Sequence, residues 1–106
     1  MAAAKKTPSV VQRSTEQVQD AITGTPVRIT KFKLKVGKVT TDDWIVTTEV
    51  LGADYPTSKI VGMSGIVIPA GGDAVQDVLT VDDSEDYVIL DGATVGDAWV
   101  ELEFTE

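Results

Sequence analysis

The sequence contains no cysteine and no histidine among its 106 residues. Without cysteine, the fold cannot use disulfide bonds or thiolate metal sites, so it must be held by apolar burial and backbone pairing. Without histidine, the chain lacks the commonest general base and transition-metal ligand. These absences exclude catalytic triads and zinc chemistry, and the sequence predicts no cofactor.

Long apolar runs are also missing. The N-terminus carries Lys5 and Lys6 but not the apolar core that follows the basic residues of a secretion signal. No later stretch approaches the about 20 consecutive apolar residues of a membrane span. We therefore expect a protein that is made in the cytoplasm and stays there, or in an assembly built there.

The composition is that of one globular domain, with 42% hydrophobic and 25% charged residues. A chain of this length can bury a core of its own. Residues 1–9 are small, basic and interrupted by Pro8, which is typical of a flexible arm. We expect this arm to precede a single β domain over residues 10–106.

The net charge of −8 is distributed unevenly. Residues 28–38 hold five basic residues and no acid, whereas residues 39–106 hold fifteen acids and the single Lys59. Nucleic acids and anionic membranes repel an acidic surface. The charge therefore argues against both as partners.

A two-residue period dominates the chain after residue 27. Phe32, Leu34 and Val36 alternate with lysines, which predicts a half-buried strand with the ammonium groups on one face. Further strands are predicted over residues 44–51, 60–68, 74–81, 87–90 and 98–104, with turns that include residues 82–86 and 91–97. The fold class is therefore all-β: a single antiparallel β-sandwich or small barrel of about seven short strands, with room for one short helix.

Two local features are less simple. Val27 and Ile29 are one residue out of phase with Phe32, which predicts a bulge or bend near Thr30. Residues 10–25 combine valines at helical spacing with β-branched residues. This segment is either a short helix or an extended strand.

The strand predicted over residues 98–104 carries carboxylates at the same two-residue spacing as the lysines of residues 31–35. Opposite charges that face each other across two strands help to fix their register. Three arrangements remain open: a ladder within the chain, pairing between subunits, or two solvated outer faces that discourage aggregation. The residues concerned are Lys31, Lys33, Lys35, Glu101 and Glu103.

Aromatic residues provide a second candidate surface. Trp44 and Trp99 are candidates for a subunit or partner interface, and the alternative is that they fill the core or the strand ends. Trp99, together with Tyr55 and nearby acids, could instead form a platform that stacks on sugar rings.

Acidic side chains gather at residues 82–86, where four carboxylates lie in five residues. Calcium favours such oxygen ligands, but the glycine and terminal glutamate of an EF-hand loop are missing, so a solvated turn is the competing interpretation. The acids that can be placed lie in turns or on outward strand faces, where solvent keeps them ionised. The sequence predicts no catalytic residues and no enzyme.

The basic arm ending near Pro8, the cysteine-free all-β body and the high content of Thr, Val and Asp together resemble small accessory structural proteins of tailed-virus particles. These include capsid decoration or cement proteins and small fibre or tail proteins. The resemblance implies a trimer on a capsid shell and an arm that adds a strand to a shell subunit.

We therefore expect a non-enzymatic structural protein of the virion that forms homo-oligomers and docks on a larger protein assembly. The alternative is an adhesion module that binds carbohydrate or another surface ligand.

Overall fold

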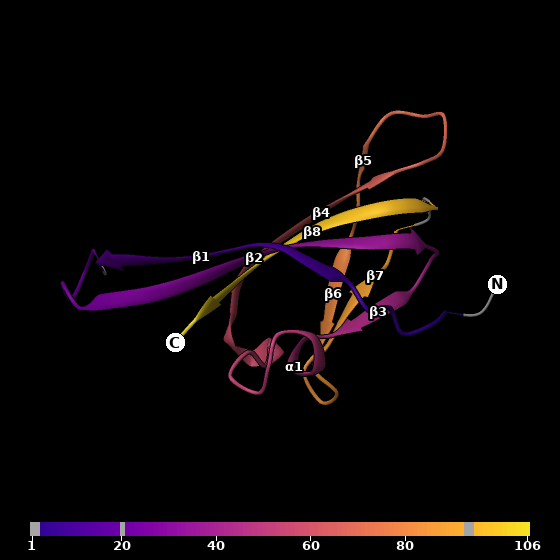
Figure 1. Ribbon diagram of the computed structural model, residues 1–106. Coiled ribbons are helices and arrows are strands. Elements are labelled where there is room, and N and C mark those ends of the chain that lie inside the picture. Colours follow the sequence, from indigo (N-terminus) through magenta and orange to yellow (C-terminus); the bar gives the residue numbers. More distant parts are fainter. Residues whose placement is uncertain (1–2, 20, 93–94) are drawn as a thin grey trace.

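The computed structural model describes residues 3–19, 21–92 and 95–106 and consists mainly of β-strands (Figure 1). The strands are β1 (Ser9–Gln19), β2 (Pro26–Val39), β3 (Asp43–Val46), β4 (Ile60–Ile68), β5 (Val75–Gln76), β6 (Leu79–Asp82), β7 (Tyr87–Leu90) and β8 (Gly96–Thr105). The helices are α1 (Thr47–Val50) and a 3-10 turn at Thr57–Lys59. Parts of three predicted segments lie outside the described residues: 1–2 of the arm, 20 of the ambiguous segment and 93–94 of the last turn. The predicted all-β class is confirmed.

The strands form two antiparallel sheets. The larger has the order β1-β2-β8-β4-β5 and the smaller the order β3-β7-β6. The smaller sheet lies against one face of the larger one, so the fold is a two-layer sandwich (Figure 1). The opposite face of the larger sheet, which we call the outer face, has no layer over it among the described residues. It carries the side chains of Lys31, Lys33, Lys35, Trp99, Glu101 and Glu103.

The core lies between the two sheets and follows the predicted two-residue period. The inward apolar residues of β2 and β8 are at most 4% exposed: Phe32, Leu34, Val36, Val39, Ala98, Val100, Leu102 and Phe104. Ile45, Val88 and Leu90 meet them from the smaller sheet. Full burial of one such large apolar side chain contributes about 1.5–3 kcal/mol, so these two strands supply most of the apolar driving force.

The strand predicted over residues 44–51 is only half strand. β3 ends at Val46, where its ladder with β7 ends opposite Tyr87. The N–H of Thr47 then donates to the carbonyl of Asp86, and the chain turns into α1. A strand that continues beyond its pairing partner leaves backbone N–H and C=O groups unpaired.

Among the described residues, no helix is long and apolar enough to cross a membrane.

The strand predicted over residues 74–81 is divided between the two sheets. β5 pairs with β4 of the larger sheet, whereas β6 pairs with β7 of the smaller one. Asp77 and Val78 make the crossing. The N–H of Asp77 donates to the carbonyl of Gly65 at 2.9 Å, and the carbonyl of Val78 accepts from Asp91 at 2.8 Å.

The ambiguous segment after residue 9 is extended, because β1 pairs with β2 from Ser9 to Gln19. The bulge predicted near Thr30 is wrong, since the register runs through this residue in both of its ladders. The shifts lie elsewhere, between Val36 and Val39 in β2 and between Val10 and Gln12 in β1. Val27 and Ile29 therefore lie on the same side of β2 as its lysines, and both are half-buried.

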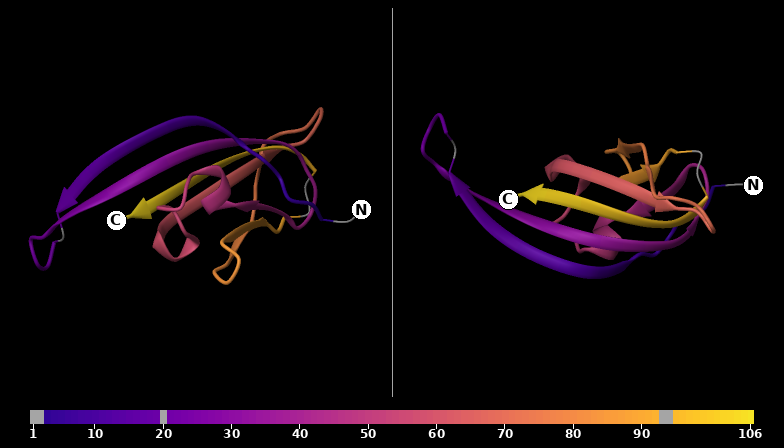
Figure 2. Two further views of the ribbon diagram at one scale, coloured as in Figure 1. Left: turned by 60° about the horizontal axis from the view of Figure 1, so that its bottom comes forward. Right: turned by 90° about the horizontal axis from the view of Figure 1, so that it is seen from above.

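The hairpin of β1 and β2 projects beyond the body. β8 reaches β2 only as far as Ile29, which pairs with Thr105, so residues 17–19 and 26–28 form a ladder of two strands alone. We call residues 17–19 and 21–28 the projecting hairpin (Figure 2). It helps to make the molecule elongated, with extents of 47 × 29 × 22 Å.

The start of β8 allows a direct test of this packing. A Cβ atom on Gly96 would overlap the backbone carbonyl of Ile68, whereas a Cβ on Gly37 would meet nothing closer than a carboxylate oxygen of Asp97 at 3.9 Å. We expect Gly96→Ala to lower the free energy of unfolding by about 1–3 kcal/mol, as overpacking does. The control Gly37→Ala should change it by less than about 0.5 kcal/mol. Urea unfolding measures both, and equal effects would contradict the close approach of β4 and β8.

Candidate functional site

The outer face brings together the charged residues that the sequence singled out. In the pairing of β2 with β8, Lys31 lies opposite Glu103, Lys33 opposite Glu101, and Lys35 opposite Trp99. The side chains alternate with the core residues of the same strands, which is why all of them point away from the smaller sheet. The ladder therefore lies within one chain.

The ladder is made of half-exposed ion pairs. Lys31 Nζ lies 3.3 Å from Glu101 and 3.9 Å from Glu103, and Lys33 Nζ lies 3.7 Å from Glu101. Lys35 Nζ lies 5.5 Å from the centre of the Trp99 ring, in a cation–π contact. Exposed pairs of this kind contribute about 0–1 kcal/mol each. They favour the register more than they stabilise the fold.

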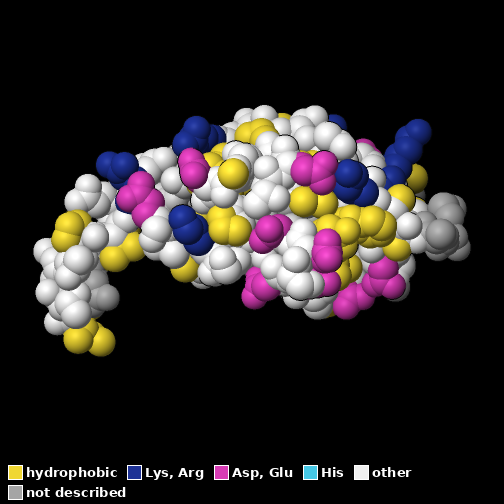
Figure 3. All heavy atoms as spheres, turned by 90° about the horizontal axis from the view of Figure 1, so that it is seen from below, with side chains coloured by type: hydrophobic (Ala, Val, Ile, Leu, Met, Phe, Trp, Pro, Cys, Tyr) yellow, Lys and Arg dark blue, Asp and Glu magenta, His cyan; other side chains and the backbone are white. Residues whose placement is uncertain are grey.

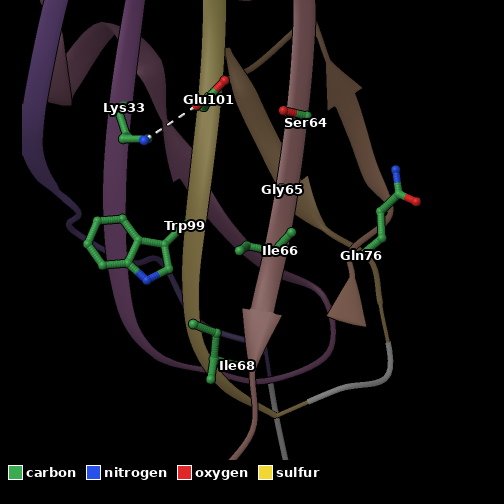
Figure 4. Close-up of a pocket in the computed structure, with 8 residues that line it drawn as sticks. All are labelled: Lys33, Ser64, Gly65, Ile66, Ile68, Gln76, Trp99 and Glu101. Atoms are coloured by element: carbon green, nitrogen blue, oxygen red, sulfur yellow. Dashed lines mark ion pairs between the residues drawn. The ribbon is translucent and has the colours of Figure 1, made fainter. Parts of the chain in front are cut away.

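A groove of about 730 Å³ lies beside this ladder on the outer face (Figure 4). Its floor is mostly apolar: Trp99 lies directly opposite Ile66 of β4, and Ile68 continues the row. Ile66 and Ile68 are each 41% exposed. Lys33 and Glu101 form one polar end, and Gln76 of β5 lies on the far side. The groove combines apolar contact area with a few polar groups that fix orientation, as ligand and partner sites do.

The sequence did not identify the two isoleucines as surface residues. It did contain a signal, because β4 is apolar on both faces around Gly62 and Gly65. The two glycines are close-approach positions. A Cβ on Gly62 would lie 3.0 Å from the Glu103 carboxylate, and one on Gly65 would lie 3.4 Å from the Leu79 side chain. The apolar residues on the outward side, however, have no layer over them among the described residues.

Trp44 is not part of this groove. It belongs to β3 of the smaller sheet, and its neighbour Ile45 points into the core, so the indole faces the opposite side of the sandwich from Trp99. Its ring stacks on Tyr87 with centroids 5.4 Å apart. The structure therefore does not combine the two tryptophans into one interface.

Tyr55 also lies away from Trp99. Its ring packs edge-on against Phe32 at 4.9 Å and Phe104 at 5.3 Å, both of which belong to the core. Arg13 of β1 donates a hydrogen bond to its hydroxyl group at 2.9 Å. The predicted sugar platform of Trp99 with Tyr55 is thus not assembled, and Trp99 alone remains available for it.

The acidic turn at residues 82–86 has structural partners. Thr57 donates its hydroxyl to Asp83 at 2.8 Å and its N–H to Asp86 at 3.1 Å, while Asp82 accepts from the hydroxyl of Ser84 at 2.6 Å. Acidic side chains are spread over the body in the view from below (Figure 3). Within the described ranges, no three Asp or Glu side chains are arranged to hold a metal ion.

The N-terminal arm contacts its own chain at β3. Ala4 accepts a hydrogen bond from the N–H of Trp44 at 3.2 Å, and the N–H of Lys6 donates to the Trp44 carbonyl at 2.8 Å. Lys5 and Trp44 thereby form a parallel bridge that extends the smaller sheet. An exposed ion pair of 3.2 Å between Lys5 and Glu49 accompanies it.

Asp43 anchors this contact. Its side chain is 1% exposed and accepts hydrogen bonds from the N–H groups of Thr40 at 2.8 Å and Ala4 at 2.9 Å, and from the Thr40 hydroxyl at 3.1 Å. Lys6 Nζ lies 3.7 Å away. Burial alone would raise the pKa of Asp43, but these hydrogen bonds and the lysine charge outweigh it and hold the pKa below its usual value.

The pKa of the neighbouring Asp42 is shifted in the opposite direction to that of Asp43. A side-chain hydrogen bond with Asp91, some burial and the repulsion between the two carboxylates raise the pKa of Asp42. Its contribution to stability is complete at low pH and is lost as the pH rises through the raised pKa.

The chain matches no protein-family model, no curated protein and no solved structure. Its function is therefore inferred from the contacts described above.

Asp43 gives a prediction with a defined pH dependence. Because its folded pKa is lowered, its contribution is complete above the unfolded pKa of about 3.9 and is lost as the pH falls through the folded value. At pH 7 we expect Asp43→Asn to lower the free energy of unfolding by about 1–3 kcal/mol, since an NH2 group replaces one of the two acceptor oxygens and then faces an N–H donor. The exposed Asp73→Asn is the control. Urea unfolding at pH 7 and pH 3 should show the gap to wild type shrinking in acid, and a constant gap would contradict the assignment.

The ladder can be tested by charge reversal. We expect Lys33→Glu and Glu101→Lys each to lower the free energy of unfolding slightly, with the second larger because Glu101 also contacts Lys31 at 3.3 Å. The double variant should recover a coupling of about 0.2–1 kcal/mol in a double-mutant cycle. The cycle of Lys35→Glu with Glu101→Lys is the control, because no ion pair between these residues is present. Equal coupling energies in both cycles would mean that the Lys33–Glu101 pair does not help to fix the register.

Proposed function

We propose that this chain is a non-enzymatic structural protein that associates with itself and docks, through the outer face, onto a larger protein assembly. A capsid decoration or cement protein of a virus particle is the role that this surface and the resemblance noted above favour together. The observation that carries the proposal is the uncovered groove around Trp99, Ile66 and Ile68.

This groove has the character of a protein interface. Aromatic and aliphatic side chains at its centre lie next to a rim of charged residues, as in the core and rim of protein complexes. Trp is also among the residue types that dominate binding energy when a partner covers them. In an isolated chain these side chains remain in contact with water, and a partner that fits over them would bury them.

The arm is less suited to docking than the outer face. If residues 4–6 added a strand to a shell subunit, they would first have to leave Trp44, and the Asp43 carboxylate would lose Ala4 as a donor. The outer face requires no such rearrangement. We therefore assign docking to the groove and a stabilising role to the arm.

The carboxylates support a role without catalysis. Those of Asp43, Asp83 and Asp86 accept hydrogen bonds from backbone or hydroxyl groups, and those of Glu101 and Glu103 face lysines. General acid–base catalysis needs groups whose pKa is tuned toward the working pH and whose proton a substrate can reach. Each of these carboxylates is already committed to a structural contact.

A carbohydrate-binding role is the second candidate, because one observation favours it. Trp99 lies in an open groove with Ser64, Gln76 and Glu101, and an indole beside hydrogen-bonding groups is the chemistry that recognises sugar rings. The loss of Tyr55 from this surface weakens the candidate, since only one aromatic ring remains.

The proposal is tested by co-sedimentation with shells assembled from the capsid protein encoded in the same genome. Wild-type protein should saturate the shells at a fixed number of copies per subunit. Trp99→Ala should weaken binding at least about tenfold, because a central aromatic anchor is removed. The control Val78→Ser alters another exposed apolar residue, 59% exposed, outside the groove, and should bind as wild type does.

The outcomes separate the two candidates. Equal binding by Trp99→Ala and wild type would remove the groove from docking, and a genome without a capsid gene would remove the virion role. A shift in tryptophan fluorescence on titration with oligosaccharides, absent in Trp99→Ala, together with no binding to shells, would favour the carbohydrate module.

A further inference from the structure

Nothing among the described residues pairs with the long edge of the larger sheet. β1 is the terminal strand of this sheet, and no backbone hydrogen bond joins Ser9–Gln19 to any described element other than β2. All eleven of its residues are exposed. One row of its N–H and C=O groups therefore faces water along the whole strand.

This edge has few of the features that normally prevent edge-to-edge pairing. Proteins protect edge strands with lysine, proline, short length, bulges or inward charges. β1 is eleven residues long and has no lysine and no proline. Its charged residues are Glu16 and Arg13, and Arg13 faces inward over the Phe32 ring. The opposite edge of the same sheet, β5, has only two residues. A bulge between Val10 and Gln12 interrupts β1, which leaves the stretch from Gln12 onward regular.

We propose that the β1 edge pairs with the β1 edge of a second copy of this chain, antiparallel, about a twofold axis that passes through Thr15. This proposal rests on the proposed function and specifies its self-association: a symmetric dimer in which the larger sheets of two chains form one continuous sheet. A twofold axis perpendicular to the sheet is the symmetry that joins identical edges antiparallel.

The charges and the bulge of β1 together favour this register. A twofold axis at Arg13 or at Glu16 would place like charges directly opposite each other, which is destabilising. An axis at Thr15 avoids both and stays clear of the bulge. It pairs seven residues per chain, and each pair joins side chains on the same face of the sheet: Thr15 with Thr15, Ser14 with Glu16, Arg13 with Gln17, and Gln12 with Val18. The threonine pair at the axis is among the favourable cross-strand pairs.

The projecting hairpin gains a third strand in this dimer. Residues 17–19 pair only with residues 26–28 in the single chain, and a two-stranded ribbon is marginally stable in water. With the axis at Thr15, residues 16–18 of each copy lie beside residues 14–12 of the other. Each hairpin is thereby supported by the body of its partner.

The symmetry also orients the proposed docking surfaces. An axis perpendicular to the sheet keeps the outer face outward in both copies, so both Trp99 grooves point in the same direction. Two grooves on one rigid dimer can engage one surface together, and the second contact then forms at high effective concentration.

A charge-swap series tests the register. Ser14→Glu should weaken the dimer roughly two- to thirtyfold, because it places a carboxylate opposite Glu16 of the partner in two symmetric pairs. Within its own chain the new carboxylate faces Lys31, which favours folding. Adding Glu16→Lys should restore the affinity, because each pair then has opposite charges. Sedimentation equilibrium measures all three proteins, and equal dimer constants would overturn the proposal.

A cysteine scan locates the axis, since the chain has no native cysteine. Thr15→Cys should form a disulfide-linked dimer rapidly on mild oxidation, because paired Cα atoms lie about 4.5–5.5 Å apart, within disulfide range. Ser14→Cys and Ser84→Cys should cross-link more slowly. Faster cross-linking of Ser14→Cys would overturn the register.

The mass of the wild-type protein in solution shows whether the β1 contact, the self-association or both are wrong. A dimer by light scattering at tens of micromolar, together with the results above, supports both. A trimer, or a dimer unaffected by Ser14→Glu, would overturn the β1 contact and leave self-association standing. A strict monomer would overturn both the contact and the self-association, while docking of the outer face would still be judged by co-sedimentation.

Discussion

The pairing of β2 with β8 is the interaction on which the rest of the structure depends. One register places Phe32 opposite Leu102 inside the sandwich and Lys33 opposite Glu101 outside it. A shift by one residue would turn the apolar set of either strand outward and separate the charged partners. Burial supplies most of the free energy, and the exposed charges add a preference for one register. The two effects reinforce each other, which is what a sequence that specifies one fold requires.

The same pairing explains why a surface is left over. The smaller sheet is built from four-residue strands, and it covers only the inner face of a sheet whose longest strand, β2, has fourteen residues. Two parts of the larger sheet therefore remain outside the sandwich: its outer face, with the groove at Trp99, and the projecting hairpin with its free edge. The hairpin is exposed because β2 is much longer than the strands of the smaller sheet, and the outer face is exposed because the smaller sheet lies on the other side.

How much of the fold could be predicted depended on whether a segment has two different faces. β2 and β8 could be predicted, since each alternates between a buried and a charged side. β1 could not be assigned, because none of its side chains is buried and backbone pairing alone decides its conformation. The end of β3 and the division of residues 74–81 are set by partner strands, which the local sequence does not reveal.

The candidate site was predicted in part for the same reason. The charges opposite each other on β2 and β8 followed from the pattern, whereas the separation of Trp44 from Trp99 depends on which sheet each strand joins. The burial of Asp43 could not be foreseen either. It arises because Ala4 and Lys6, far away in sequence, provide a donor and a charge that offset the cost of removing a carboxylate from water.

The size of the groove bears on how such a surface can act. Stable protein complexes bury about 800 Å² on each partner, and one groove whose apolar contacts come mainly from Trp99, Ile66 and Ile68 is a small part of such an area. A single copy is therefore expected to bind weakly. In the dimer that we propose, both grooves lie on one side, so a second contact would form at high effective concentration without any change in the groove. Weak sites on a symmetric scaffold suit a protein that covers a large repeating surface, where neighbouring binding positions are always within reach.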